Sequence, residues 1–167
     1  PVLAAVEGAA FGAGTALAAA CDRVIAARDA RFATTFLNVG LAGDMGAYAS
    51  LPARIGVART RRMLMMAQPV DATTALDWGL VDAVCEPGEA LRAAAADAGN
   101  LANRPAEPLG VIKKMLTLAP TLHPLDVLDR EATYQAALFE TDDFAEAVAA
   151  FQEKRTPRFG DKQGVQP

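Results

Sequence analysis

The pattern of residues 1–27 constrains the fold more than any other feature of the sequence. A β-prone run at Val2–Val6 enters a loop over residues 7–14 that contains three glycines, and glycine permits the tight turns such a loop needs. An alanine- and leucine-rich stretch at Thr15–Cys21 favours helix, and Asp22–Ala27 (DRVIAA) returns to strand character. The order strand, glycine loop, helix, strand predicts an α/β fold.

The rest of the chain predicts further α/β elements and then helices, separated by Pro105, Pro120 and Pro157. The expected elements are a short strand at Arg31–Thr35, helices at Gly46–Arg54, Arg59–Met66 and Ala72–Trp78, a closing strand at Leu80–Val84, and helices near Glu89–Asn103, Pro108–Leu118, Pro124–Glu140 and Asp142–Lys154. We therefore divide the chain into an α/β part at 1–87, a helical region at 88–159 and a flexible tail at 160–167.

The composition points to a globular protein that binds a small molecule. Hydrophobic residues make up 52% of the chain and the net charge is −4, which argues against a broad nucleic-acid surface. No apolar stretch approaches the roughly 20 residues that span a bilayer. Two cysteines and no signal segment favour a cytoplasmic location without a disulfide framework. His123 is the single histidine, so neither a histidine triad nor a histidine-rich metal site is expected.

Two loop segments are candidates for chemistry. Gly12-Ala13-Gly14 at a strand-to-helix junction can present backbone N–H groups to a polarised oxygen, or it can be a tight turn with close helix packing. Asp44 follows Gly43 among apolar residues, where partial burial would suit its carboxylate to proton transfer. The alternative role of Asp44 is to cap the following helix, and the two roles can coexist.

The remaining candidates are cations and thiols. Lys113, Lys114, Lys154 and Arg155 could bind phosphate groups, although solvated helix faces explain them equally well. Cys21 and Cys85 lie in apolar surroundings that are typical of inert thiols.

Several segments together resemble the crotonase (enoyl-CoA hydratase/isomerase) superfamily. They are PVLAAVEG at residues 1–8, FGAGTALAAACD at 11–22, Phe32, Gly40-Leu41, ALDWGLVDAV at 75–84, and the A-F-x-E-K-R-x-P-x-F ending at 150–159. The resemblance implies a spiral of ββα units followed by a helical trimerisation region. It also implies homotrimers or dimers of trimers. Because the chain begins inside a core strand, we expect the N-terminal part of the spiral to be missing and the 167-residue chain alone to be inactive.

The resemblance also implies roles for single residues. The Ala13 N–H, presented beside Gly12, would be an oxyanion-hole donor to an acyl-coenzyme A thioester. The positions where the hydratases carry two glutamates hold Ala16 and Phe36, and neither can transfer a proton. Asp44 stands where some isomerases of the family carry a catalytic aspartate. Its surroundings are similar to those in ring-epoxide phenylacetyl-CoA isomerases.

These residues predict an acyl-CoA isomerase in which Asp44 is the acid/base and Ala13 the oxyanion donor. Phe36 and Leu37 would line the acyl pocket, and Lys154 would contact coenzyme A phosphate. Coenzyme A is part of the substrate, so no separate cofactor and no metal are expected. An enoyl-CoA hydratase with atypical residues and a non-catalytic crotonase-like scaffold remain alternatives.

Overall fold

The computed structural model describes residues 1–160. Internal contacts divide the chain into two compact units, Pro1–Ala98 and Gly99–Pro167, and each is described by itself. The flexible tail predicted at 160–167 lies, after Gly160, outside the described residues. The division at residue 87 into a spiral core and a trimerisation region stays a prediction.

The first unit contains two three-stranded sheets. Its strands are β1 (Leu3–Val6), β2 (Ala9–Phe11), β3 (Arg23–Ala27), β4 (Arg31–Ala33), β5 (Val70–Asp71) and β6 (Ala83–Cys85). One sheet has the parallel order β1-β3-β6, with Leu3 opposite Arg23 and Ile25 opposite Ala83. In the other sheet, β4 pairs in parallel with β2 and antiparallel with β5.

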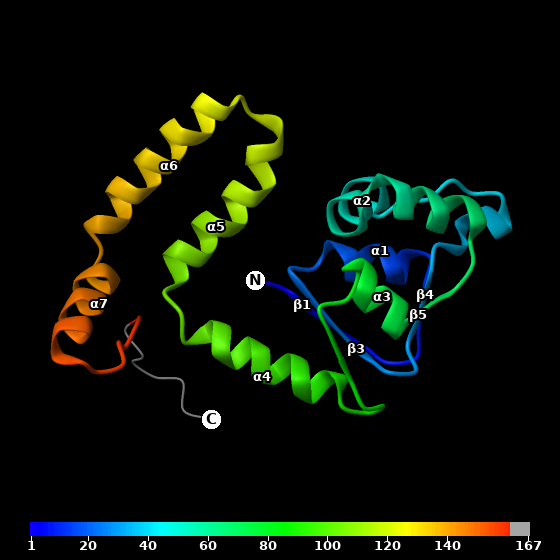
Figure 1. Cartoon of the computed structure of the whole chain (residues 1–167), viewed down its shortest axis with the longest axis horizontal. Coiled ribbons are helices and arrows are strands. Elements are labelled where there is room, and N and C mark those ends of the chain that lie inside the picture. Colours follow the sequence, from blue (N-terminus) through cyan, green and yellow to red (C-terminus); the bar gives the residue numbers. More distant parts are fainter. Residues whose placement is uncertain (161–167) are drawn as a thin grey trace. The chain divides into compact units, whose positions relative to one another are not determined.

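A strand–strand–helix unit repeats along this part of the chain (Figure 1). Helix α1 (Ala13–Ala20) follows β1 and β2, and the 3₁₀ helix η1 (Thr35–Val39) and helix α2 (Ala47–Met66) follow β3 and β4. The first strand of each pair joins one sheet and the second strand joins the other. This alternation confirms the predicted ββα architecture.

The core of the first unit lies between the helices and the sheets. Helix α1 packs against α2, and the alanines Ala16 and Ala19 on its buried face let the two helices approach closely. The largest fully buried side chains include Phe32, Ile25, Leu51, Met63 and Leu80. These residues come from strands, from helices and from the turn after helix α3 (Ala72–Trp78). The side chains of Phe32, Leu51, Met63 and Leu80 pack together in one hydrophobic core.

The element boundaries in this unit agree with the sequence prediction at one place and differ from it at two. The run at 47–66 has a non-helical residue, Gly56, with φ +73°, so it consists of two helical segments as predicted. The predicted glycine loop contains the strand β2. The closing strand begins at Ala83, not at Leu80, because Leu80 and Val81 are buried in the turn after α3 without pairing in a sheet.

The later helices are α3 (Ala72–Trp78), α4 (Ala90–Ala102), α5 (Ala106–Leu118), α6 (Pro124–Phe139) and α7 (Asp142–Glu153). A short 3₁₀ helix, η2 (Ala119–Thr121), lies between α5 and α6. Their caps follow from the sequence: the Asp71 carboxylate accepts the Thr74 N–H at 2.7 Å, and His123 Nδ1 accepts the Leu125 N–H at 3.3 Å. His123 therefore caps α6.

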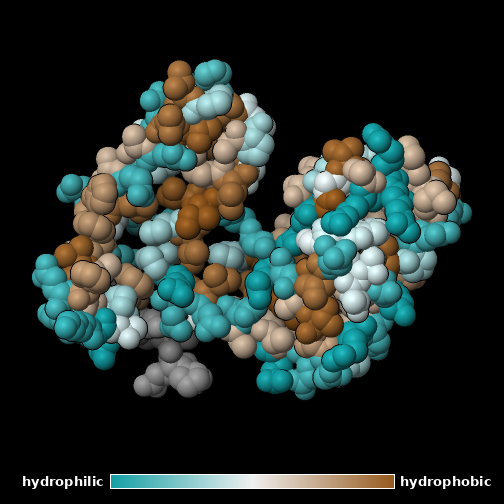
Figure 2. Space-filling view, viewed as in Figure 1, coloured by the Kyte–Doolittle hydropathy of each residue, from teal (hydrophilic) through white to brown (hydrophobic). Residues whose placement is uncertain are grey.

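In the second unit α5 packs against α6, and α6 packs against α7. Of the apolar side chains described in this unit, Ala150 alone is buried, whereas many larger ones are exposed (Figure 2). Among residues 1–160, no helix is both long and apolar enough to cross a bilayer.

Candidate active site

The turn that begins α1 leaves one backbone N–H without an acceptor. Gly12 is the N-cap residue and adopts φ +56°, a conformation that favours glycine. Its own N–H donates to the Ala33 carbonyl at 2.7 Å, which fixes the turn to β4. Ala13 is the first helical residue, and its N–H finds no backbone acceptor among residues 1–160. This N–H can therefore donate to a ligand.

Thr15 anchors the same turn, and sequence reasoning did not identify it. Its side chain is fully buried, its hydroxyl donates to the Ala10 carbonyl at 2.5 Å, and its oxygen accepts the Ala33 N–H at 3.1 Å. One side chain thus links α1 to both β2 and β4. The only sequence signal was a hydroxyl residue in an otherwise apolar helix.

The ring of Phe36 lies between Gly12 and Gly43. A Cβ atom added at Gly12 would lie 3.9 Å from Phe36 Cε1, and one added at Gly43 would lie 3.4 Å from Phe36 Cδ2. These two ring atoms belong to opposite edges of the ring. The fold therefore brings the turn at Gly12 and the loop that carries Asp44 against the same side chain.

Asp44 is exposed, so the partial burial predicted for it is wrong in this chain. The alternative role of Asp44 as a helix cap is also wrong, because Gly46 is the N-cap residue of α2. The Asp44 backbone carbonyl accepts the Ala47 N–H at 3.0 Å. Within the part of the chain that the structure describes, its carboxylate makes no hydrogen bond or ion pair. The carboxylate is accordingly accessible to a ligand.

Leu37 lines an open apolar cavity of about 390 Å³ between η1 and α2. Its side chain is 54% exposed, whereas the neighbouring Phe36 is buried. The Tyr48 hydroxyl donates to the Ala42 carbonyl and holds the loop before Asp44 at the edge of this cavity. The other lining residues are Leu41, Pro52, Val57, Thr60, Arg61, Leu64 and Met65.

Lys154 belongs to the second unit, where it is the exposed C-cap residue of α7 with φ +57°. Arg155 is bound to the Glu146 carboxylate through two nitrogens, at 2.6 and 2.9 Å, and it also pairs with Glu153 at 2.5 Å. Lys114 lies over the Tyr134 ring at 5.1 Å. Arg155 and Lys114 thus have intramolecular partners.

The cysteines are free, and both are partly buried. Burial, reinforced by the nearby Glu7 carboxylate, raises the pKa of the Cys85 thiol. A raised pKa keeps the thiol protonated near neutrality, which agrees with the absence of a chemical role for Cys85.

A family model described as enoyl-CoA hydratase/isomerase matches residues 1–162. Among curated proteins, the chain is 38% identical over 97% of its length to a 1,2-epoxyphenylacetyl-CoA isomerase from Escherichia coli strain K12. It is 40% identical over 95% of its length to a "probable enoyl-CoA hydratase" from Rhodobacter capsulatus. It is 34% identical over 97% of its length to a trans-2-decenoyl-[acyl-carrier-protein] isomerase from Streptococcus mutans. The chain spans 62% of the length of each of these relatives.

Solved structures agree in fold. An enoyl-CoA hydratase structure from Polaromonas sp. JS666 superposes with a TM-score of 0.91 at 38% identity, covering 96% of this chain and 62% of that one. An enoyl-CoA hydratase from Mycobacterium tuberculosis H37Rv superposes with a TM-score of 0.91 at 32% identity. The match covers 96% of this chain and 64% of that one. The similar proteins thus carry hydratase names and isomerase names alike.

Proposed function

The chain belongs to the enoyl-CoA hydratase/isomerase family, the crotonases, and from this premise we propose that the protein is an acyl-CoA isomerase. The Ala13 N–H donates to the thioester carbonyl and stabilises the enolate oxygen that forms when a proton leaves the adjacent carbon. Asp44 removes that proton and returns it to another carbon of the acyl group. The observation that carries the proposal is the place of the Phe36 ring, which lies within 4 Å of the Cβ positions of both Gly12 and Gly43, the residue before Asp44.

The buried side chains at the two family glutamate positions favour isomerisation over hydration. Ala16 is fully buried in α1, and Phe36 is buried between two glycines. Neither side chain can activate a water molecule. Proton transfer between two carbons of an enolate can be done by a single carboxylate, and Asp44 is exposed without a partner among residues 1–160.

The apolar cavity beside Leu37 supports an apolar acyl group as the substrate. Its lining is almost entirely apolar, and its volume of about 390 Å³ is in the range of small-molecule pockets. We propose that Phe36 forms the floor of the acyl site and that Leu37 lines its wall. Lys154 would contact a coenzyme A phosphate, with coenzyme A bound as part of the substrate and no separate cofactor.

The decisive experiment is an assay of the full-length protein with 2-enoyl-, 3-enoyl- and ring-epoxide phenylacetyl-CoA. Double-bond position, ring opening and incorporation of ¹⁸O from labelled water are measured separately. We expect rearrangement without ¹⁸O incorporation. Asp44→Asn should lower kcat by about 10² to 10⁴-fold, because it removes the group that transfers the proton.

The alternatives give different results in the same assay. Efficient ¹⁸O incorporation would identify a hydratase with atypical residues. Binding of acyl-CoA without turnover, unchanged by Asp44→Asn, would identify a non-catalytic scaffold. Glu131→Gln is the control, because Glu131 is an exposed carboxylate on α6 that forms no ion pair within residues 1–160.

A further inference from the structure

Helix α1 connects the proposed oxyanion donor to a partly buried arginine, Arg54, at its other end. The helix has only eight residues, from Ala13 to Ala20, and no basic residue in its last turn. Its last carbonyl groups lack intrahelical partners. The Leu17 and Ala18 carbonyls accept from the side chain and the backbone of Cys21, at 3.3 and 3.1 Å.

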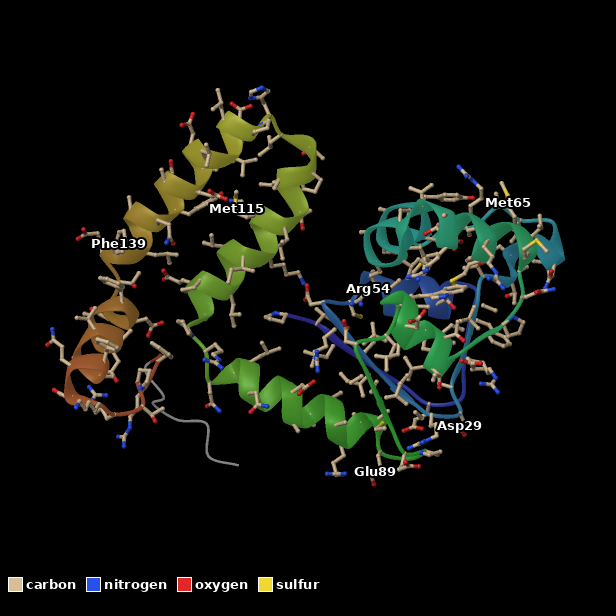
Figure 3. The ribbon with its side chains drawn as sticks, viewed as in Figure 1. Asp29, Arg54, Met65, Glu89, Met115 and Phe139 are labelled. Carbon is tan, nitrogen blue, oxygen red and sulfur yellow. The ribbon has the colours of Figure 1, made fainter. Side chains whose placement is uncertain are left out.

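Arg54, from the first segment of α2, binds two further carbonyls at this end of α1 (Figure 3). Its Nε donates to the Ala19 carbonyl at 3.0 Å, and its Nη2 donates to the Cys21 carbonyl at 2.7 Å. The Arg54 side chain is only 13% exposed. A cation at this end of the helix also interacts favourably with the helix dipole.

The same guanidinium is held from its other side by Asp82. Arg54 Nη1 lies 3.2 Å from Asp82 Oδ2, and this oxygen also accepts the Val24 N–H of β3 at 2.6 Å. The planar guanidinium thus connects α2, the end of α1 and the start of β3 in one hydrogen-bonded network. A lysine cannot reproduce this geometry, because its ammonium group lacks the fixed fork of donors.

Both ends of α1 are therefore fixed by specific bonds. Thr15 and Gly12 hold the N-terminal turn against β2 and β4, and Arg54 holds the C-terminal carbonyls. In a helix this short, movement of the C-terminal end changes the direction of the N–H groups at the other end. Arg54 also lies on α2, the helix that follows the loop of Asp44.

We infer that Arg54 is a positioning residue for the proposed reaction: it sets the direction of the Ala13 N–H toward the thioester carbonyl and its placement relative to Asp44. This inference depends on the proposed function. Arg54 touches no reacting atom. Its contribution is to keep α1 and α2 in the arrangement in which the donor and the carboxylate act on the same acyl group.

The test uses the full-length protein and a thioester labelled with ¹³C at its carbonyl. The infrared stretching frequency of the bound carbonyl falls when the oxyanion donor polarises it, so it reports on Ala13 directly. Arg54→Met should lose part of this downshift, and its kcat should fall by between about tenfold and a hundredfold with KM changed less than about twofold. The carbonyl downshift and the kcat of Arg54→Lys should lie between those of the wild type and those of Arg54→Met.

Arg59→Met is the matched control. Arg59 also lies on α2, but it donates to the Trp78 carbonyl at 3.1 Å and lies over the Trp78 ring, and no hydrogen bond joins it to α1. The inference predicts a wild-type carbonyl frequency and kcat for this variant. Equal losses in Arg59→Met and Arg54→Met would assign Arg54 a general structural role and overturn the inference, as would a wild-type frequency in Arg54→Met.

Two further outcomes are distinguishable. If Arg54→Met does not fold, Arg54→Lys decides: a reduced downshift supports the inference and an unchanged one overturns it. If the wild type itself shows no carbonyl downshift and no turnover with any thioester, the proposed function has failed and the inference fails with it.

Discussion

At the residue scale, two glycines beside the Phe36 ring adopt backbone conformations that favour glycine. The ring is in contact range of a Cβ atom at either Gly12 or Gly43, whose φ values are +56° and +114°. A larger residue at either position would need an unfavourable backbone conformation, although the ring leaves its Cβ at ordinary contact distance. The loop of Asp44 and the turn at Gly12 thus both adjoin the Phe36 ring.

The first prediction concerns the buried Thr15 hydroxyl and the stability of the fold. Thr15→Val keeps the shape of the side chain but leaves the buried Ala33 N–H and Ala10 carbonyl without their hydroxyl partner. We expect the free energy of unfolding to fall by about 1 to 3 kcal/mol, the cost of burying unsatisfied polar groups. Urea denaturation followed by circular dichroism measures this change.

The control for this substitution is Thr133→Val. The Thr133 hydroxyl donates to the Asp129 carbonyl at 2.8 Å on an exposed face of α6, where water can replace it. An unfolding midpoint that moves equally in both variants would contradict the anchoring role of Thr15.

At the element scale, the end of α7 is held by its own carboxylates. Glu146 accepts from two Arg155 nitrogens and from the Arg158 N–H at 2.7 Å, and Asp143 accepts the Gly160 N–H at 3.0 Å. The chain after the helix therefore turns back along α7. The Arg155 guanidinium, with the Arg158 N–H, lowers the pKa of Glu146 to about 2.

This lowered pKa predicts a pH-dependent contribution from Glu146. A carboxyl group whose folded pKa lies below its ordinary value of 4.5 stabilises the fold above that value, and the effect is lost as the pH falls through about 2. Glu146→Gln should therefore lower Tm at pH 7 and have little effect below pH 2. Thermal unfolding at both pH values, with Glu131→Gln as the charge-matched control, measures the difference. A Tm difference independent of pH would contradict this assignment.

At the scale of the whole molecule, the helices of the second unit expose much of their apolar surface. Three apolar side chains on α7, those of Phe144, Val148 and Phe151, are 42%, 41% and 86% exposed. Phe144 packs edge-on against Phe139, with ring centroids 5.0 Å apart, but Phe151 has no ring partner among the residues described. Further exposed apolar side chains are Ile112, Leu116, Leu125 and Leu128. The family resemblance predicts homotrimers or dimers of trimers, and we propose that these exposed apolar side chains lie at their interface.

Phe151→Ser tests this proposal. Burying one phenylalanine side chain contributes about 1.5 to 3 kcal/mol, so its loss should weaken self-association by about tenfold or more. Sedimentation velocity over a range of protein concentrations measures the change. Leu91→Ser, at a residue that is 73% exposed on α4, should leave association unchanged. Association equal to the wild type in Phe151→Ser would exclude this face.

Local pattern was sufficient for most elements. The strand at Leu3–Val6, the helix at Ala72–Trp78 and the four later helices follow from apolar runs, caps and prolines that act within a few residues. The sequence also identified Gly12 and Ala13 as part of a strand-to-helix turn. These features depend on the backbone preferences of neighbouring residues, which the sequence contains directly.

Long-range contacts were decided only by the tertiary structure. The exposure of Asp44, the burial of Leu80 outside any strand, and the anchoring by Thr15 and Arg54 each depend on residues far away along the chain. From neighbouring residues alone, a threonine in a helix or an arginine next to a helix kink that bonds to a distant strand or helix cannot be distinguished from one that faces solvent. The sequence thus determined the elements and the family resemblance, because both are local patterns. Packing determined which polar groups meet, because their partners are brought together only by folding.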